Sequence, residues 1–355
     1  MKRLRNIALS LVVISFFSVV ALCTFYNINM AKVSNNSDTK EVEIKEGSLS
    51  SVAETLKENN LIKNVTIFKV YTKLTSKTSL KAGTYSLSEN MGVKKIVSIL
   101  EEGKTNEDNI TFKEGINVRK VAKLIAEKTN NEYEDVLKTM NDSTIIDELI
   151  DKYWFLTNDI KNKDIYYPLE GYLFPDTYRI SKSANTKDII TKILDETDNK
   201  FSKYKEELQN NDLSIHEIIT LASIVELEVA NKDDRKAVAG VFINRLNSKY
   251  FPTLGSDATS YYGAKIDDWS TNRLTSVELN DCTNKYNTRC AYNKGLPVGP
   301  IGNPSIESIE AVLYPEKHSN YYFVNDCKGK LYMTKSETEH NNIINKLKKE
   351  NNWCA

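Results

Sequence analysis

The chain has 355 residues, with 48 basic and 48 acidic side chains that give a formal net charge of zero. With 40% hydrophobic residues, 13 glycines and 7 prolines it is too apolar for a disordered or collagen-like chain, and its length suggests two or three domains. The balanced charge provides no overall field that would hold a polyanion, so the composition gives no indication of nucleic-acid binding.

The N-terminal segment is a candidate membrane anchor. Three of the first five residues are basic, and the run over 7–27 carries no charge and is long enough for a helix to cross a bilayer. Leu22, just before Cys23, is bulkier than the residue that signal-peptide or lipoprotein processing normally requires, so a lipoprotein is the less favoured alternative. We expect a cytoplasmic tail over 1–6 and a single-pass anchor over 7–27 in the cell membrane, with the remainder extracytoplasmic.

A polar linker over 28–40 precedes a small α+β module over 41–108. The alternation in EVEIKEG predicts a strand, and Ser48 can cap a helix over 49–59. AGTYSL predicts a second strand, and a second amphipathic helix begins near Met91. Strand, KEG turn and helix then occur again from residue 109, which leaves an internal repeat and two unrelated turns as equal alternatives.

The remainder, 109–355, is predicted to be a larger α+β domain. Acidic helices over 130–165 lead into YYPLEGYLFPDTYRI, whose prolines and glycine exclude a regular helix and predict an ordered aromatic loop. Its aromatic side chains could stack on sugar rings, although core packing is the commoner role. The predicted helices and the loop-rich stretch that follow are, in order, helices over 186–209, 214–230 and 235–246, loops from Phe251, and a helix over 306–313. Two strands, YYFV and KLYMT, and a polar helix from Glu337 complete the chain.

Four cysteines lie outside the apolar run: Cys282, Cys290, Cys327 and Cys354. Their spacings do not resemble Cys-x-x-Cys metal sites and the three histidines are scattered, so we expect no metal, and no cofactor is implied. In an oxidising exterior the four thiols allow three pairings, of which Cys282 with Cys290 is the nearest in sequence. Free thiols are an equal alternative.

The sharpest chemical signal is the helix over 214–230, which is apolar on nearly every face. Glu217 lies in its first turn, where a carboxylate caps the helix. Glu228 lies four residues before Lys232, an order typical of a surface ion pair. Glu226, in contrast, has small or apolar neighbours at helical spacing and no cation within reach along the helix.

Burial would raise the pKa of Glu226, and a protonated carboxyl can protonate a poor leaving group such as a glycosidic oxygen. The alternative is a structural glutamate paired with Arg235 or Arg245. Glu170 is a second acid, among aromatic residues. The motifs of serine hydrolases, β-lactamases and P-loop proteins are missing from the sequence, and no Cys/His pair has a plausible orienting residue.

The motifs ASIVELE, VAGVFINRL, SDATSYYG, YNT and GLPVGPIGNP occur in that order, and with them the chain resembles the MltG (YceG-like) family of membrane-anchored endolytic murein transglycosylases. The resemblance implies a LysM-like module over 41–108 and a YceG-like catalytic domain over 109–355. It also implies cleavage of peptidoglycan glycan strands between N-acetylmuramic acid and N-acetylglucosamine, leaving 1,6-anhydromuramoyl ends and terminating nascent strands beside peptidoglycan synthases. The family's catalytic glutamate, the first acid of ASI(V/I)E-x-E, falls on Glu226.

Three departures from the family pattern concern the site. Gly255 and Ala258 stand where members commonly have Gln and Pro, Leu227 replaces a Lys, and Arg289 follows YNT. Besides Glu226, the candidate substrate-binding residues, on motif membership, are Asp257, Thr259, Tyr262, Asn287 and Glu170.

Two alternative functions stay open. One is a noncatalytic glycan-binding scaffold for cell-wall synthases. The other is a two-acid hydrolase that pairs Glu226 with Glu170 and leaves reducing ends.

Overall fold

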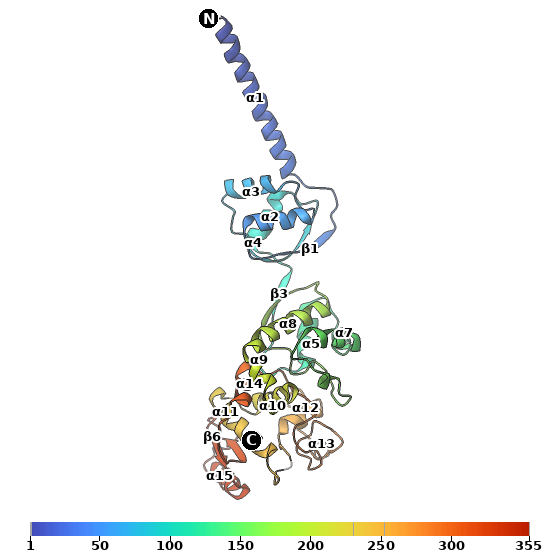
Figure 1. The fold of residues 1–355 in the computed structure, drawn as a ribbon, viewed down its shortest axis with the longest axis vertical. Helices are drawn as coiled ribbons and strands as arrows, with labels where there is room; N and C mark the ends of the chain where they lie inside the picture. The colour runs from blue at the N-terminus through green and yellow to red at the C-terminus, as the bar shows by residue number, and fades with distance from the viewer. Residues whose placement is uncertain (1, 230, 252, 355) are drawn as a thin grey trace. The chain divides into compact units, whose positions relative to one another are not determined.

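A computed structural model describes residues 2–229, 231–251 and 253–354 (Figure 1). It divides into two compact units: the first is Met1–Asp108 with Arg179–Ser183, and the second is Asn109–Tyr178 with Ala184–Ala355. The fold mixes helices and short two-stranded sheets, as expected for an α+β chain.

The first unit begins with α1 (Lys2–Met30), whose segment Leu9–Met30 is long and apolar enough to cross a membrane. This finding fits the predicted single-pass anchor. The side of the membrane on which the chain begins stays a prediction.

A small module follows α1. Its elements are β1 (Thr39–Ile44), α2 (Leu49–Glu58), α3 (Val65–Leu74), β2 (Gly83–Ser88) and α4 (Val93–Glu102). β1 and β2 are antiparallel, with Val42 opposite Tyr85. The predicted cap is confirmed, because the Ser48 side chain accepts a hydrogen bond from the backbone N–H of Ser51. Apolar side chains from α2, α3, α4 and both strands form its core. The LysM-like identity of this module stays a prediction.

The second unit carries the remaining helices and strands, except that the strand Thr177–Ser181 has its last three residues in the first unit. From the N-terminal side they are β3 (Glu107–Thr111, its first two residues in the first unit), α5 (Val118–Lys128), α6 (Tyr133–Met140), α7 (Ser143–Lys152), η1 (Asn158–Lys161), β4 (Thr177–Ser181), α8 (Thr186–Phe201), η2 (Ser202–Tyr204), α9 (Lys205–Gln209), α10 (Ile215–Glu228), η3 (Lys232–Asp234), α11 (Arg235–Leu246), α12 (Asp257–Gly263), α13 (Ser276–Leu279), α14 (Ile306–Leu313), β5 (Tyr322–Asn325), β6 (Leu331–Thr334) and α15 (Glu337–Lys349). The predicted helix over 214–230 ends at a residue that lies outside the described ranges.

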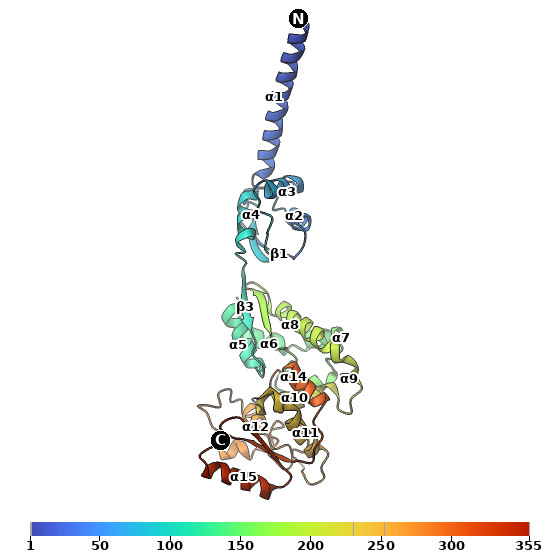
Figure 2. The same cartoon turned by 90° about the vertical axis from the view of Figure 1, so that its left-hand side faces the viewer.

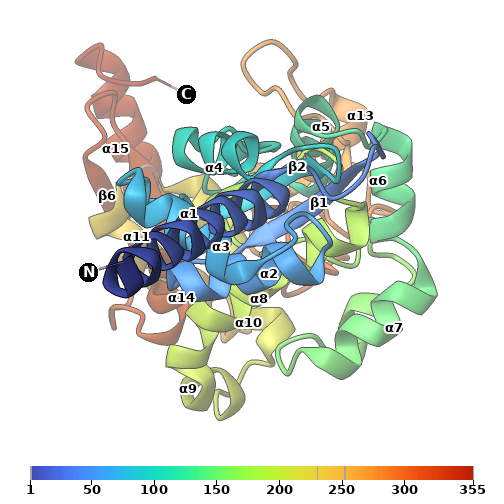
Figure 3. The ribbon, with the colours of Figure 1, turned by 90° about the horizontal axis from the view of Figure 1, so that it is seen from above.

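Packing within the second unit follows the apolar faces of its helices. Helix α6 contacts both α5 and α7, and Figure 3 shows it between them. Helix α10 contacts α14 and α11, and α11 contacts α14, so these three helices form one packed group (Figure 2). The C-terminal end of α10, which carries Glu226 and Glu228, therefore belongs to this packed group of helices.

The aromatic loop is a core element. Tyr172, Phe174 and Tyr178 are buried, and the hydroxyl of Tyr178 donates a hydrogen bond to the backbone carbonyl of Phe174 at 2.8 Å. Core packing is thus confirmed over sugar stacking for these three side chains.

Two disulfides resolve the open cysteine pairing. Cys282 pairs with Cys290, the nearest partner in sequence, and Cys327 pairs with Cys354. The free-thiol alternative is therefore wrong for these four residues. The second disulfide joins the β5–β6 turn to the segment after α15.

Candidate active site

Helix α10 holds two of the candidate acids at its C-terminal end. It begins with a capping box in which Ser214 and Glu217 satisfy each other's backbone N–H groups, so the capping role predicted for Glu217 is confirmed. The helix is buried from Ile215 to Val225. Because residues two apart do not share a helix face, Glu226 and Glu228 meet different surroundings.

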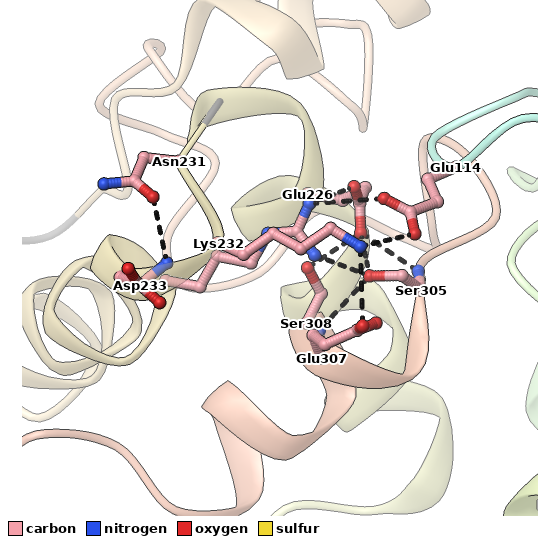
Figure 4. A network of polar contacts seen from close by, with 9 residues as sticks. Glu114, Glu226, Asn231, Lys232, Asp233, Ser305, Glu307 and Ser308 are labelled. Atoms are coloured by element: carbon pink, nitrogen blue, oxygen red, sulfur yellow. Dashed lines mark hydrogen bonds and ion pairs between the residues drawn. The ribbon is translucent and has the colours of Figure 1, made fainter. Parts of the chain in front are cut away.

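Glu226 is enclosed by polar partners (Figure 4). Its Oε1 accepts a hydrogen bond from Nη2 of Arg235 at 2.6 Å, and the two side chains are 5% and 4% exposed. Its Oε2 accepts from the backbone N–H and the hydroxyl of Ser305, at 3.0 and 2.6 Å, and from the hydroxyl of Ser308 at 2.8 Å. As predicted, α10 itself supplies no cation to Glu226, but Arg235 of the next helix does, and this is the pairing that the structural alternative named.

The ion pair belongs to a wider network. Arg235 also lies 3.7 Å from Glu114, and Lys232 contacts Glu114 at 2.9 Å and Glu307 at 3.4 Å. The surface ion pair predicted between Glu228 and Lys232 is therefore wrong, since Lys232 binds these other two carboxylates. The network joins the turn before α5 to η3, α11 and α14 (Figure 4).

Glu228 is half-buried and has a different environment. Its Oε1 accepts a hydrogen bond from the hydroxyl of Ser256 at 2.5 Å. Burial raises the pKa of the Glu228 carboxyl above its ordinary value, and the charge of Asp257 raises it further, whereas the Ser256 hydrogen bond and the charge of Arg245 lower it. A carboxyl with a raised pKa can hold a proton for transfer to a ligand.

Two cavities involve neighbours of these acids. Leu227 contributes to the wall of a cavity of about 270 Å³, which we call the Leu227 cavity, and the lining is completed by Gly115, Asn117, Lys120, Tyr262, Ile266, Asp267, Trp269 and Ile301. Arg245 and Leu254 contribute to a second cavity of about 370 Å³. Neither Glu226 nor Glu228 is among the residues that line these two cavities.

The candidate substrate-binding residues after α11 differ in how far they are buried. Asp257 is exposed and forms an ion pair with Arg289, while Tyr262 is buried and lines the Leu227 cavity. Thr259 is fully buried and accepts a hydrogen bond from the backbone N–H of Thr288.

Asn287 is likewise buried. Its side-chain amide donates to three backbone carbonyls, those of Glu278, Leu279 and Asp281. Neither Asn287 nor Thr259 lines the Leu227 cavity or the second cavity.

Glu170 is 1% exposed and its oxygens are occupied. They accept hydrogen bonds from the backbone N–H of Val118, the first residue of α5, and from the hydroxyl of Tyr262 at 2.8 Å. Burial raises the pKa of Glu170 to about 7, against the lowering effect of these donors. Glu170 therefore anchors α5 and Tyr262, and it lines neither of the two cavities described above.

Sequence reasoning missed Ser256 and Arg245 as neighbours of Glu228. The spacing Glu-x-Glu was the available signal, because two acids two residues apart on a buried helix must point in different directions. This spacing could have shown that Glu226 and Glu228 meet different surroundings, but it could not have shown which surroundings belong to which acid. Among residues 2–229, 231–251 and 253–354, no group of three or more His, Cys, Asp or Glu side chains is arranged to hold a metal ion.

Comparisons with known proteins identify similar chains. The model of a family described as YceG-like matches residues 42–346. A protein of Bacillus subtilis (strain 168) named endolytic murein transglycosylase is 35% identical over 312 residues, which cover 86% of this chain and 84% of that protein. A protein of the same name from Streptococcus pneumoniae serotype 2 (strain D39 / NCTC 7466) is 32% identical over 326 residues, covering 87% of this chain and 58% of the relative.

A solved structure is also similar. The 2.6 Å crystal structure of a yceG-like protein from Listeria monocytogenes has 37% sequence identity and a TM-score of 0.61. The match covers 87% of this chain and 100% of that one.

Proposed function

Because the chain belongs to the YceG-like family, we propose that it is an endolytic peptidoglycan lytic transglycosylase, a carbon–oxygen lyase. The reaction would cleave glycan strands between N-acetylmuramic acid and N-acetylglucosamine and leave a 1,6-anhydromuramoyl end. The names of relatives at 32–35% identity, which align over most of this chain, support this activity.

The observation that carries the mechanism is the contrast between the two acids of α10. Burial raises the pKa of Glu228, the charge of Asp257 raises it further, and its Oε1 accepts a hydrogen bond from the neutral hydroxyl of Ser256. Glu226 is held by Arg235, Ser305 and Ser308, with 5% of its side chain exposed. This contrast favours Glu228 as the proton donor and Glu226 as a positioning residue that fixes the end of the helix.

One carboxyl is sufficient for a lytic transglycosylase. Glu228 would protonate the bridging glycosidic oxygen as the bond to C1 of the muramic residue breaks. The resulting carboxylate would then accept the proton of the C6 hydroxyl of the same sugar while that oxygen bonds to C1. The acid is regenerated, water is not consumed, and no second acid of the kind that glycoside hydrolases use is required.

The assignment of the acid to Glu226 remains the competing candidate. It rests on the family resemblance, and the enclosure of the carboxyl by Arg235, Ser305 and Ser308 weighs against it, because these contacts occupy both of its oxygens. Asp257 and Tyr262 remain candidate substrate contacts. The burial of Thr259, Asn287 and Glu170 favours positioning roles for these three residues.

We also propose the cellular setting. The apolar helix α1 would anchor the protein in the cell membrane in a single pass, with the basic end in the cytoplasm and the second unit outside. The module over 41–108 would act as a LysM-like glycan-binding module. Peptidoglycan synthases are proposed partners, since the reaction would terminate strands that such enzymes elongate.

The experiment that tests this function identifies the chain ends made from uncrosslinked glycan strands by the detergent-solubilised full chain, read by mass spectrometry. Anhydromuramoyl ends are expected. Reducing ends would instead indicate a hydrolase. Binding to murein sacculi without any product would favour the noncatalytic scaffold.

A further inference from the structure

The Leu227 cavity has a composition that suits a sugar ring. Apolar side chains of Leu227, Ile266 and Ile301 form part of the wall, Trp269 adds an aromatic ring, and Lys120 brings a cation. Carbohydrate-sized pockets combine apolar or aromatic walls with a few polar groups in this way. The volume of about 270 Å³ lies just below the range of ~300–1,000 Å³ for drug-sized ligands, so it suits one ring and not several.

The loop that carries Trp269 is set by the end of α12. Lys265 adopts a left-handed conformation with φ of 58°, and its N–H donates to the carbonyl of Tyr262 at 2.9 Å. The N–H of Ile266 donates to the carbonyl of Tyr261 at 3.0 Å, which completes a Schellman motif. The chain therefore turns back over the helix that it has just left.

This turn holds the indole ring of Trp269 in place. The ring stacks on Tyr261 with centroids 5.0 Å apart and an interplanar angle of 23°. Its Nε1 donates a hydrogen bond to the carbonyl of Ile266 at 3.1 Å. One face of the indole is thus covered by Tyr261, and Trp269 forms part of the wall of the Leu227 cavity.

A second restraint joins the same loop to the start of α5. Asp267 accepts hydrogen bonds from Nε of Arg119 at 3.0 Å, from Nη2 of Arg119 at 2.5 Å and from the side-chain amide of Asn117 at 2.6 Å. Lys120 donates to the backbone carbonyl of Asp267 at 2.9 Å. A bidentate arginine–carboxylate contact is geometrically specific, so the loop is held in one position before any ligand arrives.

We propose that the Leu227 cavity is a subsite for one N-acetylated pyranose ring of the glycan strand, with Trp269 as its stacking platform. The apolar face of the ring would lie on the free face of the indole, and the methyl of the N-acetyl group would contact the apolar wall around Leu227. The proposal rests on the proposed function for its identification of the ring as part of a glycan strand. It adds a specificity-determining residue to the unit that carries both acids of α10.

The test measures binding in the Glu228→Gln background, where turnover would not consume the ligand. The full chain in detergent is titrated by calorimetry with a β-1,4 hexasaccharide of N-acetylglucosamine and, separately, with the corresponding glucose hexasaccharide. We expect the N-acetylated ligand to bind more tightly. Trp269→Ala should weaken its binding about tenfold, the loss of an aromatic contact near 1.4 kcal/mol, whereas Trp269→Tyr should restore most of it.

Trp353→Phe is the matched control, because Trp353 stacks near Lys348 outside the cavity. It should leave the affinity unchanged. Equal affinity of Trp269→Ala and its parent for the N-acetylated ligand would overturn the proposal, as would equal affinity of the parent for the two hexasaccharides. In the active chain, Trp269→Ala should raise KM with kcat retained.

The two proposals fail separately. A wild-type chain that makes no anhydromuramoyl ends but binds the hexasaccharide through Trp269 would contradict the enzymatic function and support the subsite. If the wild-type chain makes those ends and the Trp269→Ala variant has the same KM, the enzymatic function is supported and the subsite is contradicted.

Discussion

Arg235 donates a hydrogen bond from Nη2 to Oε1 of Glu226 at 2.6 Å, and about 5% or less of either side chain is exposed. The two residues come from consecutive helices, α10 and α11, and Ser305 bonds to both of them. A buried pair of this kind is costly to break, because removal of one partner leaves the other as an uncompensated charge. The pair supports the proposed positioning role of Glu226 at the end of α10.

The first prediction concerns this pair. Glu226→Gln should lower the free energy of unfolding by about 3–5 kcal/mol, since buried Arg235 loses its close carboxylate partner and keeps only the more exposed Glu114 at 3.7 Å. The double variant Glu226→Gln/Arg235→Met should recover most of that loss, because neither charge remains and the glutamine oxygen can still accept from Ser305. Urea unfolding of the three proteins measures both changes.

The control is Lys232→Met, which removes an exposed partner of the same network and should cost about 1 kcal/mol or less. A single Glu226→Gln variant as stable as the parent would contradict the structural role of Glu226.

The second prediction concerns the pH dependence of the reaction. The proposed role of Glu228 as the acid predicts that the rate falls as pH rises through its pKa. The Ser256 hydroxyl stabilises the carboxylate and lowers that pKa. Ser256→Ala should therefore move the alkaline limb of the kcat/KM profile to higher pH.

Ser260→Ala provides the control, because its buried hydroxyl donates to Asn287 and not to Glu228. The limb should stay in place for this variant. A limb that moves to lower pH in Ser256→Ala would show that the titrating group is not the Glu228 carboxyl.

The third prediction concerns stability at different pH values. Burial raises the pKa of Glu170 to about 7, so between its ordinary value of 4.5 and 7 the folded chain holds a proton that the unfolded chain has lost. Stability from this group is complete below about pH 4.5 and declines as pH rises to about 7, by roughly 3 kcal/mol. In Glu170→Gln, the free energy of unfolding should lack this part of its decline with rising pH. Equal slopes of unfolding free energy against pH in the variant and the parent would contradict the shift.

The fourth prediction compares the two disulfides. Cys282 and Cys290 enclose Thr288, whose backbone carbonyl and hydroxyl accept hydrogen bonds from the N–H groups of Gly255 and Ser256. Replacing both cysteines by alanine should therefore reduce activity as well as stability, the latter by about 2–3 kcal/mol from the loop closed.

Replacing Cys327 and Cys354 by alanine is the comparison. This pair closes a longer loop, so the loss of stability should be somewhat larger, about 3–4 kcal/mol, with activity retained. Thermal unfolding and product release measure the two effects. Retained activity in the Cys282/Cys290 double variant would contradict the prediction, because it would show that the loop closed by this disulfide does not support the site.

Much of the fold could be predicted because its signals are local. Ser214 and Glu217 form the capping box that their spacing indicates, and the predicted helices over 235–246 and 306–313 match α11 and α14 at both ends. Helical periodicity and caps depend on neighbours within a few residues, which a sequence displays directly. The short helices α12 and α13 lie in a stretch that was predicted as loops, since they are too short to show a period.

The site was harder to predict because its contacts are not local. The cation beside Glu226 comes from Arg235, and the hydroxyl beside Glu228 comes from Ser256, 28 residues away in the chain. Motif membership grouped Asn287 with Asp257, yet one is buried in backbone contacts and the other is exposed. Spacing shows which residues share an element, and only packing shows which of them meet a cavity.

The central claim is that Glu228 donates the proton, and the most direct test is the yield of anhydromuramoyl ends from uncrosslinked glycan by two variants of matched stability. Glu228→Gln should lower the initial rate by at least about a hundredfold, the usual contribution of a general acid, while Glu226→Gln/Arg235→Met should retain most of it. Mass spectrometry that finds wild-type yield from Glu228→Gln, and none from the folded double variant, would contradict the account.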